Sequence, residues 1–543
     1  MRRNFPQALF ALLFAVLMTG HLSATTYYVA ANGIDSNNGT SKTTPWLHAP
    51  GMSTCTGTCA STTINAGDSI IFRGGDTWHF GNSSLTPFAG FQNNAWNFAQ
   101  SGSSTNCQLN PANGTIVTTS CIYIGVDQSW YSGSDWTRPA FNMDNPITTS
   151  SPSSCAYEDS SYNLINFSGQ YLVIDNLEIL GYCWNTTSPW NEVVNISAND
   201  EMKNSYWHGW TMGKTATGCG SCDSDEYWAI NSPNSLSQYS RMDHNVFDGS
   251  DSTYGNLSGS YGDATGGIFK GGGEADHNVL NHCSNGVKYT LMYIFHDNYL
   301  NYMYEPAVGG THGNIFELPP TTWSRDSYYY NNIALYNNTG ETVDFYPGSS
   351  SSNKAGYIFN NVMVNPDGHA GVNCYMLEGD ATPGPVYFFN NTSDSSCTMR
   401  NPGRGSNTAT FQNNHFISYS PSGSIGDFSS VTNSDNGSEV WQSVATANSQ
   451  GYSVSNNWAP TSGSDSTVGQ GTNLSSICNA MDNAEAAAAC MSGFGGVTYD
   501  AVNHVAVDST AVARGSSWDV GAYQFGSGSS SPNPPTGLSA LVQ

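Results

Sequence analysis

Charged side chains are scarce in this sequence. They make up 10% of its 543 residues, against about 25% in an ordinary globular domain. Lys and Arg together number 15 while Asp and Glu number 41, which gives a formal net charge of −26. A nucleic-acid-binding surface needs many basic side chains to neutralise phosphates. The composition therefore excludes nucleic acid as an expected partner.

Long hydrophobic segments are missing beyond the N-terminus. No later stretch approaches the roughly 18 consecutive apolar residues of a membrane-spanning helix. At the start of the chain, the basic pair Arg2–Arg3 precedes a shorter apolar run, Ala8–Met18, and the small residues Ser23–Ala24 follow. This order is typical of a secretory signal peptide, although a buried N-terminal helix is the alternative interpretation. We therefore predict a signal peptide over residues 1–24 and a secreted or extracellular monomer with no membrane span.

Gly, Ser, Asn, Thr and Tyr take the place of the missing charged residues, with 57 Gly and 30 Tyr in the chain. Helices need long, straight side chains on their wet faces, whereas turns need Gly and Asn, and strands accept Tyr and Thr. The composition therefore predicts a protein rich in strands and turns.

Cysteine usage agrees with export, because all 13 cysteines follow the predicted cleavage site and most occur in sequence-local couples. An oxidising compartment favours disulfides in loop-rich chains. Cys219-Gly-Ser-Cys222 could also be half of a zinc or redox site, but a single CxxC without a second pair favours a loop-closing disulfide. Cys283 is left over, and we expect a buried thiol. The expected pairs are Cys55–Cys59, Cys107–Cys121, Cys155–Cys183, Cys219–Cys222, Cys374–Cys397 and Cys478–Cys490.

A short motif, an Asn followed by apolar or aromatic residues, recurs along the chain. Examples are DHNVF at 243–247, DHNVL at 276–280 and NNVMV at 360–364. Between the copies at 245 and 414 the spacing runs from 20 to 34 residues, a range that marks solenoid proteins. The shared positions are Asn176, Asn245, Asn278, Asn298, Asn332, Asn361, Asn391 and Asn414.

Stacked coils explain why one residue type repeats. Adjacent strands lie about 4.8 Å apart, so equivalent residues of successive coils meet. Asn tolerates the left-handed backbone of a tight corner, and its amide can bond to the Asn of the next coil. The short spacing from Asn278 to Asn298 leaves no room for a helix between coils, which excludes an α/β horseshoe, and a propeller blade needs about 40 residues. We predict an all-β, right-handed parallel β-helix with side loops and terminal caps.

The coil stack needs a cap at each end, because an open coil exposes its core and unpaired backbone groups. We predict one parallel β-helix domain over 25–525, with an N-terminal cap over about 25–80 and a C-terminal cap over about 500–525. Residues 526–543 begin GSGSSSPNPP and form a flexible Gly/Ser/Pro-rich tail.

The opening YYVAANGIDSNNGTS and the ending WDVGAYQF resemble the two ends of secreted parallel β-helix proteins, including the family 9 pectate lyases. The resemblance implies the pectate-lyase-like fold, and it implies activity only weakly. The segment 262–286 is similar to the region where those lyases carry calcium-binding carboxylates, so that Asp263 matches the first of them. Ser284-Asn285-Gly286 has no carboxylate where the acidic cluster would fall. The calcium motif is thus incomplete; no cofactor is required by these residues, the metal is unknown, and Ca²⁺ is a candidate.

Ionisable residues concentrate between residues 241 and 325, which hold five of the 12 histidines. Stacking would bring Asp243 beside Asp276 and His244 beside His277, and such like-charge contacts shift pKa values as catalytic clefts require. The alternative is a set of outward, solvated strand positions. As acid/base or charge-neutralising groups we predict His244, Asp263, Lys270, His312 and Glu317.

Aromatic residues crowd the long interval between the first two copies of the motif. Tyr and Trp in loops above a groove suit stacking on sugar rings, and the alternative is that they cover the core. As substrate-binding residues we predict Trp207, Trp210, Trp228, Arg241 and Tyr261.

These observations favour an extracellular carbohydrate-active enzyme, a polysaccharide hydrolase or lyase acting in a groove along the coils. The alternative is a non-catalytic glycan-binding or cell-surface adhesion solenoid, which would retain a polysaccharide without cleaving it. Because an acidic surface repels polyanions, we expect a neutral or weakly charged glycan.

Overall fold

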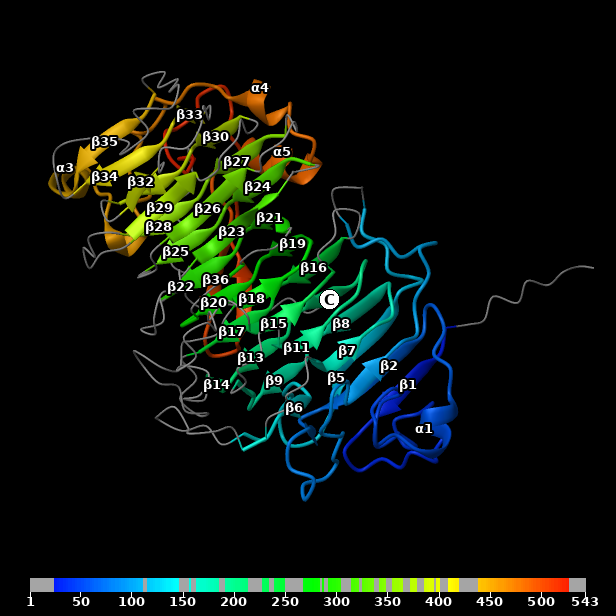
Figure 1. Cartoon of the computed structure of the whole chain (residues 1–543). Coiled ribbons are helices and arrows are strands. Elements are labelled where there is room, and N and C mark those ends of the chain that lie inside the picture. Colours follow the sequence, from blue (N-terminus) through cyan, green and yellow to red (C-terminus); the bar gives the residue numbers. More distant parts are fainter. Residues whose placement is uncertain are drawn as a thin grey trace, which may run out of the picture.

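The computed structural model of the chain is a stack of coils whose strands form long parallel sheets (Figure 1). Each full coil contributes one strand to each of three walls, here called sheets B, A and C. Crossover connections between parallel strands of one sheet are right-handed. The predicted right-handed parallel β-helix is confirmed. The structure describes residues 24–110, 115–145, 156–157, 163–184, 191–212, 227–233, 239–249, 267–283, 286–287, 292–303, 314–321, 325–335, 341–347, 354–364, 372–377, 385–394, 397–400, 409–418 and 438–526.

Sheet A has twelve strands among the described residues and runs the length of the stack. Its inward positions follow in register from coil to coil, for example Met202, Met242 and Ala275, and all three are fully buried. Its strands, in spatial order, are β1 (Thr26–Val29), β2 (Ser69–Gly74), β5 (Ile122–Tyr131), β8 (Leu172–Asp175), β12 (Glu201–Lys203), β16 (Ser240–Asp243), β19 (Gly273–Asp276), β21 (Met292–His296), β24 (Ser327–Tyr330), β27 (Gly356–Phe359), β30 (Val386–Phe389) and β33 (Ala409–Gln412).

Sheet C forms the second long wall and also has twelve described strands. Its apolar side chains, such as Trp207 and Phe247 in neighbouring coils, close the core from the other side. Its strands are β3 (Thr77–His79), β6 (Ala140–Asn142), β9 (Glu178–Leu180), β13 (Tyr206–His208), β17 (Val246–Asp248), β20 (Val279–Asn281), β22 (Tyr299–Asn301), β25 (Ile333–Leu335), β28 (Val362–Val364), β31 (Thr392–Ser393), β34 (His415–Ser418) and β35 (Val440–Ser443).

Sheet B, the third wall, consists of two runs that single bridges through Val287 connect, from Phe269 on one side to Phe316 on the other. The first run contains β4 (Trp96–Phe98), β7 (Asn163–Phe167), β11 (Asn191–Asn195), β15 (Tyr227–Asn231) and β18 (Gly267–Lys270). The second run contains β23 (Asn314–Thr321), β26 (Glu341–Pro347), β29 (Val372–Leu377) and β32 (Cys397–Arg400).

The remaining described elements are short. No helix among the described residues is long and apolar enough to cross a membrane. These elements are the strand pair β10 (Cys183–Trp184) and β14 (Thr211–Met212), the antiparallel hairpin β36 (Val497–Asp500) and β37 (Val505–Asp508), the helices α1 (Gly57–Ser61), α3 (Val444–Ser449), α4 (Ser475–Cys478) and α5 (Ala484–Cys490), and the 3₁₀ turn η5 (Val454–Asn456).

The predicted stack of asparagines lies at the corner between sheets A and C. The backbone N–H and the Nδ2 of each Asn donate to the Oδ1 of the Asn one coil further on, at 2.9–3.2 Å. All seven are buried, so every amide in the row is desolvated and hydrogen-bonded. The confirmed members of this Asn ladder are Asn245, Asn278, Asn298, Asn332, Asn361, Asn391 and Asn414.

Two details of the ladder differ from the prediction. The left-handed backbone belongs to the residue before each ladder Asn and not to the ladder Asn itself. Asn176 is one of those left-handed residues, with φ 64°, and the ladder position in its coil is Leu177. Ser205 continues the row by donating its N–H to Asn245 at 3.1 Å. The sequence motif identified the corner correctly and placed the turn one residue late.

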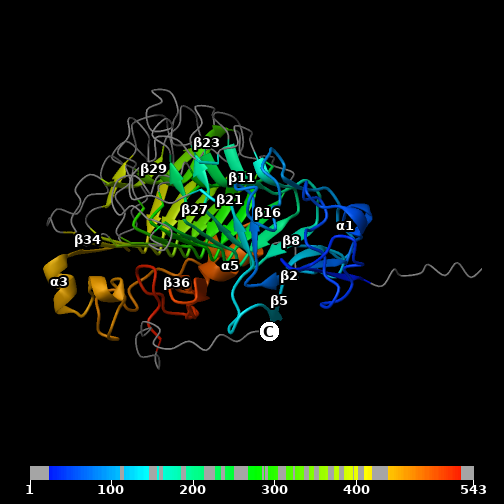
Figure 2. The same ribbon diagram turned by 90° about the horizontal axis from the view of Figure 1, so that it is seen from below.

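The segment predicted as the C-terminal cap, about 500–525, does not lie only on the last coil. After β35 the chain turns back along the corner between sheets A and C, where Figure 2 shows α5 and β36 beneath the strands. Tyr328 donates to Asp482 at 2.7 Å, and further along, Arg138 donates to the carbonyl of His504 at 3.2 Å. The returning segment therefore covers coils from the middle of the stack.

Disulfides form where sequence-local couples were predicted. Cys283 is a free, buried thiol, as expected, and Cys183 is disulfide-bonded while its predicted partner lies outside the described residues. The side chains of the predicted Cys219–Cys222 and Cys374–Cys397 pairs also lie outside them. The confirmed disulfides are Cys55–Cys59, Cys107–Cys121 and Cys478–Cys490.

Candidate functional sites on two faces of the solenoid

The outer face of sheet A carries a block of charged side chains in the middle of the stack. Strand alternation places residues two apart on the same face, so the outward positions of β12, β16 and β19 hold one charged residue beside the next. Further along, on β24, β27 and β30, aromatic rings occupy the same positions. The outward charged residues are Glu201, Lys203, Arg241, Asp243, Glu274, Asp276 and His296.

Arg241 lies at the centre of this block and is 8% exposed. Its Nε and Nη2 donate to the two oxygens of Asp276 at 3.0 and 2.5 Å, and its Nη1 donates to Glu201 at 3.0 Å. The same nitrogen lies 3.5 Å from Asp243. Burial alone would raise the pKa of Asp276, but the guanidinium charge outweighs it and holds that pKa well below its ordinary value. Arg241 thus neutralises buried carboxylates in three successive coils.

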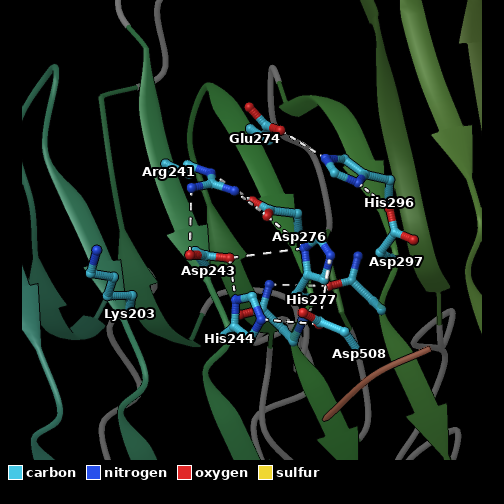
Figure 3. Close-up of polar contacts among 12 residues, drawn as sticks. Lys203, Arg241, Asp243, His244, Glu274, Asp276, His277, His296, Asp297 and Asp508 are labelled. Atoms are coloured by element: carbon cyan, nitrogen blue, oxygen red, sulfur yellow. Dashed lines mark hydrogen bonds and ion pairs between the residues drawn. The ribbon is translucent and has the colours of Figure 1, made fainter. Parts of the chain in front are cut away.

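Two imidazoles stack beside Arg241, at the corner between sheets A and C (Figure 3). The rings of His244 and His277 are 4.6 Å apart and nearly parallel. Each ring faces the preceding aspartate through Nδ1, at 2.6 Å to Asp243 and 2.9 Å to Asp276. Each Nε2 faces Asp508 from β37, at 3.2 and 3.9 Å. Burial lowers the pKa of His244, but hydrogen bonds to the two aspartates outweigh it and raise that pKa to about 10.

A third histidine, His296, lies deeper in the same block. Its Nε2 is 2.7 Å from Glu274 and its Nδ1 is 2.5 Å from Asp297, so carboxylates hold both nitrogens. Burial opposes protonation, yet the two carboxylates raise the pKa of His296 well above its ordinary value. The ring of Tyr330 stacks on it at 4.5 Å. These contacts bury His296 between two carboxylates and an aromatic ring.

Three sets of side chains in this block present possible metal ligands within 4.8 Å of one another, and all three combine imidazole with carboxylate. Two of the sets use His296, whose nitrogens both bond to carboxylates. The sets are Asp243 with His244 and His277, His277 with His296 and Asp297, and Glu274 with His296 and Glu485.

The outer face of sheet B carries a different polar feature, a row of asparagines that ends at a lysine. Neighbouring amides are hydrogen-bonded along the row, at 3.3, 2.8 and 2.7 Å. The strand register continues from Asn231 on β15 to Lys270 on β18. We call these residues the sheet B row: Asn97, Asn166, Asn195, Asn231 and Lys270.

Lys270 closes the sheet B row with an ion pair. Its Nζ lies 3.1 Å from Glu192 on β11 and 5.7 Å from the ring centre of Trp228 on β15. The side chains of Lys270 and Glu192 are 15% and 6% exposed. Burial raises the pKa of Glu192, and the lysine only partly offsets this effect. The pair therefore places a carboxyl group with a raised pKa beside an ammonium group at the end of a polar row.

Glu317 occupies a related register position. Phe316 follows Phe269 in register through Val287, so Glu317 stands in β23 where Lys270 stands in β18, two coils further on. The position of Asp344 follows Glu317 in β26. The backbone register thus places two of the predicted catalytic residues, Lys270 and Glu317, in one column of sheet B.

The residues predicted as one site therefore belong to two faces. His244 and Arg241 lie at the sheet A block, whereas Lys270 and the position of Glu317 lie on sheet B. Asp263, His312 and Tyr261 lie outside the described residues. Asp263 is the one carboxylate of the incomplete calcium motif, so Ca²⁺ binding there stays a prediction.

The predicted sugar-stacking tryptophans are buried. Trp207 and Trp210 are 0% and 3% exposed and belong to the hydrophobic core, and Trp228 is 1% exposed next to Lys270. The rings of Trp207 and Trp210 fill space inside the coils, whereas the ring of Trp228 lies beneath the Lys270 ammonium group.

Sequence reasoning missed Asp508 and the asparagines of the sheet B row. Asp508 is 264 residues from His244, and no local pattern announces a contact of that range. The asparagines of the row are 69, 29 and 36 residues apart and have different neighbours. An outward Asn at the same place in successive sheet B strands would have been the available signal.

No protein-family model and no curated protein matches this chain. Solved structures that resemble it include pectate lyase Pel9A, at 16% identity and TM-score 0.45, covering 92% of this chain and 96% of that one. A rhamnogalacturonan lyase aligns at 15% identity and TM-score 0.36, covering 72% and 87%. A lacto-N-biosidase from Eubacterium ramulus aligns at 10% identity and TM-score 0.33, covering 77% and 66%. At such identities a likeness concerns the fold and leaves the reaction open.

Proposed function

We propose that this chain is a secreted carbohydrate-active enzyme that cleaves a polysaccharide lying along the outer face of sheet B. The observation that carries the proposal is the Lys270–Glu192 pair at the end of the sheet B row. Amide side chains are both donors and acceptors, so a row of them, one per coil, suits the hydroxyl groups of an extended sugar chain.

Lys270 and Glu192 are the residues proposed to move protons. A carboxyl group whose pKa is raised by burial keeps its proton to a higher pH than an exposed one, as a general acid for a leaving glycosidic oxygen requires. An ammonium group beside it can stabilise the negative charge that develops on the substrate. Glycoside hydrolysis requires a second carboxylate within about 10 Å of the first. Glu317 stands four coils from Glu192 in the sheet B register, roughly 19 Å at about 4.8 Å per coil, so a carboxylate closer to Glu192 is required.

The choice of substrate follows from charge. The chain has a formal net charge of −26, and Lys270 is already paired with a carboxylate. A neutral or weakly charged glycan meets less repulsion on this surface than a polyuronate does.

The test is a panel of neutral and acidic polysaccharides incubated with the purified secreted chain, with and without a chelator. We expect new reducing ends from at least one neutral or weakly charged glycan, without the ultraviolet absorbance of the unsaturated product that a lyase leaves. Lys270→Met and Glu192→Gln should each lower the rate by about 100-fold or more, with an unchanged circular dichroism spectrum. Lys42→Met, which removes an exposed lysine paired with Asp127, should leave the rate unchanged.

The outcomes separate the alternatives. Full activity in both Lys270→Met and Glu192→Gln would remove the proposed site. Ultraviolet-absorbing products would show that the reaction is elimination by a lyase and not hydrolysis. Retention on a polysaccharide gel without any new reducing end would favour the glycan-binding solenoid, for which the Asn part of the row alone would suffice.

A further inference from the structure

Helix α5 of the returning segment lies over polar side chains on the outer face of sheet A (Figure 2). Glu274 on β19 and His296 on β21 are 1% and 0% exposed. Glu485 of α5 approaches them from the other side, and one ligand atom of each of the three residues lies within 4.8 Å of the other two. Two carboxylates and one imidazole from distant parts of the chain therefore meet beneath α5.

His296 is held as a metal-binding histidine is held. In metal sites one ring nitrogen binds the ion while the other donates its N–H to a carboxylate, which fixes the tautomer and the ring orientation. Asp297 faces Nδ1 of His296 at 2.5 Å, and Nε2 faces Glu274 at 2.7 Å. Asp297 therefore orients the ring, and Glu274 stands beside the nitrogen that is left to bind an ion.

Two oxygen atoms in this cluster have no hydrogen-bond partner among the described residues. They are Oε2 of Glu274 and the hydroxyl of Tyr330, and both atoms are buried. The Tyr330 ring is 1% exposed and stacks on His296 at 4.5 Å. Burial, and after it the carboxylate of Glu485, raises the pKa of Tyr330 well above its ordinary value, so the hydroxyl lies among the same carboxylates. Buried oxygens without a partner are rare in proteins, and here they point to a ligand.

The spacing of the three side chains suits one small ion after a short adjustment. Bonds of about 2.0–2.1 Å in a tetrahedral site leave neighbouring ligand atoms about 3.3 Å apart. An ion would replace the proton that His296 and Glu274 share, so these two atoms would separate from 2.7 Å by about 0.6 Å. The side chain of Glu485 is half-buried at the surface of α5, so it can move toward the other two.

We propose that the Glu274 carboxylate, Nε2 of His296 and the Glu485 carboxylate bind one zinc ion, which fastens α5 to the middle of the solenoid. An imidazole nitrogen with carboxylate oxygens is a ligand set for zinc, whereas calcium and magnesium take oxygen ligands. A water molecule within reach of the Tyr330 hydroxyl fills the fourth position. This site lies on a different face from sheet B and does not depend on the proposed reaction.

Three variants separate zinc binding from a general loss of charge. Glu485→Gln keeps the shape of the ligand that α5 supplies and removes its charge, and Glu274→Gln does the same on the solenoid side. Asp482→Asn is the matched control, because it removes a carboxylate from the same returning segment. That carboxylate is 48% exposed and bonds to Tyr328 outside the proposed site.

The experiment is calorimetric titration of Zn²⁺ into the full secreted chain after chelator treatment and dialysis. We expect one ion per chain, with affinity lowered at least tenfold in Glu485→Gln and Glu274→Gln and unchanged in Asp482→Asn. Zn²⁺ should also slow hydrogen exchange in residues 484–490 of the wild-type chain and not of Glu485→Gln. If Glu274→Gln does not fold, Glu485→Gln at the surface of α5 decides. The proposal is overturned if the stripped wild-type chain binds no Zn²⁺, if Ca²⁺ displaces the Zn²⁺, or if Glu485→Gln binds Zn²⁺ as tightly as wild type.

Discussion

Replacing Asn332 by alanine tests the Asn ladder where it is fully buried. The Oδ1 of Asn332 accepts from the backbone N–H and the Nδ2 of Asn298 at 3.1 and 3.0 Å. Its Nδ2 donates to the carbonyl of Phe295 at 3.0 Å and to Asn361 at 3.1 Å. The substitution deletes all four hydrogen bonds without changing a charge.

The expected loss follows from which groups keep a partner. The Nδ2 of Asn298 still donates to Ala275, and Asn361 still accepts from the backbone N–H of residue 332. The backbone N–H of Asn298 loses its ladder acceptor in a dry environment, which costs about 1–3 kcal/mol, and the other groups lose roughly 0.5 kcal/mol each. We expect Asn332→Ala to lower the free energy of unfolding by about 3–4 kcal/mol.

Urea denaturation followed by tryptophan fluorescence measures this loss through the transition midpoint. The matched control is Asn97→Ala at the exposed end of the sheet B row, where water replaces the lost partners. That variant should stay within about 0.5 kcal/mol of wild type. A loss in Asn332→Ala below about 1 kcal/mol, or equal losses in the two variants, would refute the argument that burial of the ladder amides makes them stabilising.

Three further predictions concern other buried polar groups. Burial lowers the pKa of His415 from 6.5 to about 4. As the pH falls, the unfolded chain therefore takes up a proton at His415 before the folded chain does. The contribution of neutral His415 to the free energy of unfolding is thus complete above pH 6.5 and is lost as the pH falls toward 4. Between pH 7 and 4.5, the free energy of unfolding of His415→Gln should therefore fall by roughly 2–3 kcal/mol less than that of wild type, as measured by urea titration. Equal falls in the two proteins would contradict the lowered pKa of His415. Arg241→Met strands Glu201 and Asp276 without their cation, so the free energy of unfolding should fall by about 3–5 kcal/mol, and a loss under 1 kcal/mol would count against the network. Tyr499→Phe removes the hydrogen bond that the Tyr499 hydroxyl of β36 donates to Asp248 of β17. Proteolysis within residues 497–508 should therefore become faster while the global urea midpoint moves little, and an unchanged cleavage rate would argue against a stabilising role of this bond.

The sequence predicted the fold well because the coil repeats leave a local signature. The ladder asparagines recur with apolar neighbours at 20–34 residues, and desolvated amides tolerate few substitutes at that corner. The off-by-one placement of the turn arose because both residues before the apolar pair are often Asn, as in Asn331-Asn332 and Asn360-Asn361. Only the backbone shows which of the two is left-handed.

The candidate sites were predictable only in part. The neighbour relations Asp243 with Asp276 and His244 with His277 follow from coil stacking and were predicted. The return of the C-terminal segment over that corner was not, because a contact between distant parts of the chain leaves no periodic trace. Aromatic crowding was ambiguous for a physical reason, since a ring that fills the core and a ring that stacks on a sugar are the same residue type.

The central claim, that sheet B presents the polysaccharide-binding face, is tested most directly by a crystal structure of the Lys270→Met variant with an oligosaccharide of the glycan that the wild-type chain cleaves. The account predicts sugar rings along the sheet B row, with hydroxyl groups bonded to Asn195 and Asn231 and a glycosidic oxygen beside Glu192. An oligosaccharide bound on the outer face of sheet A, or anywhere else that leaves the sheet B row uncovered, would contradict it.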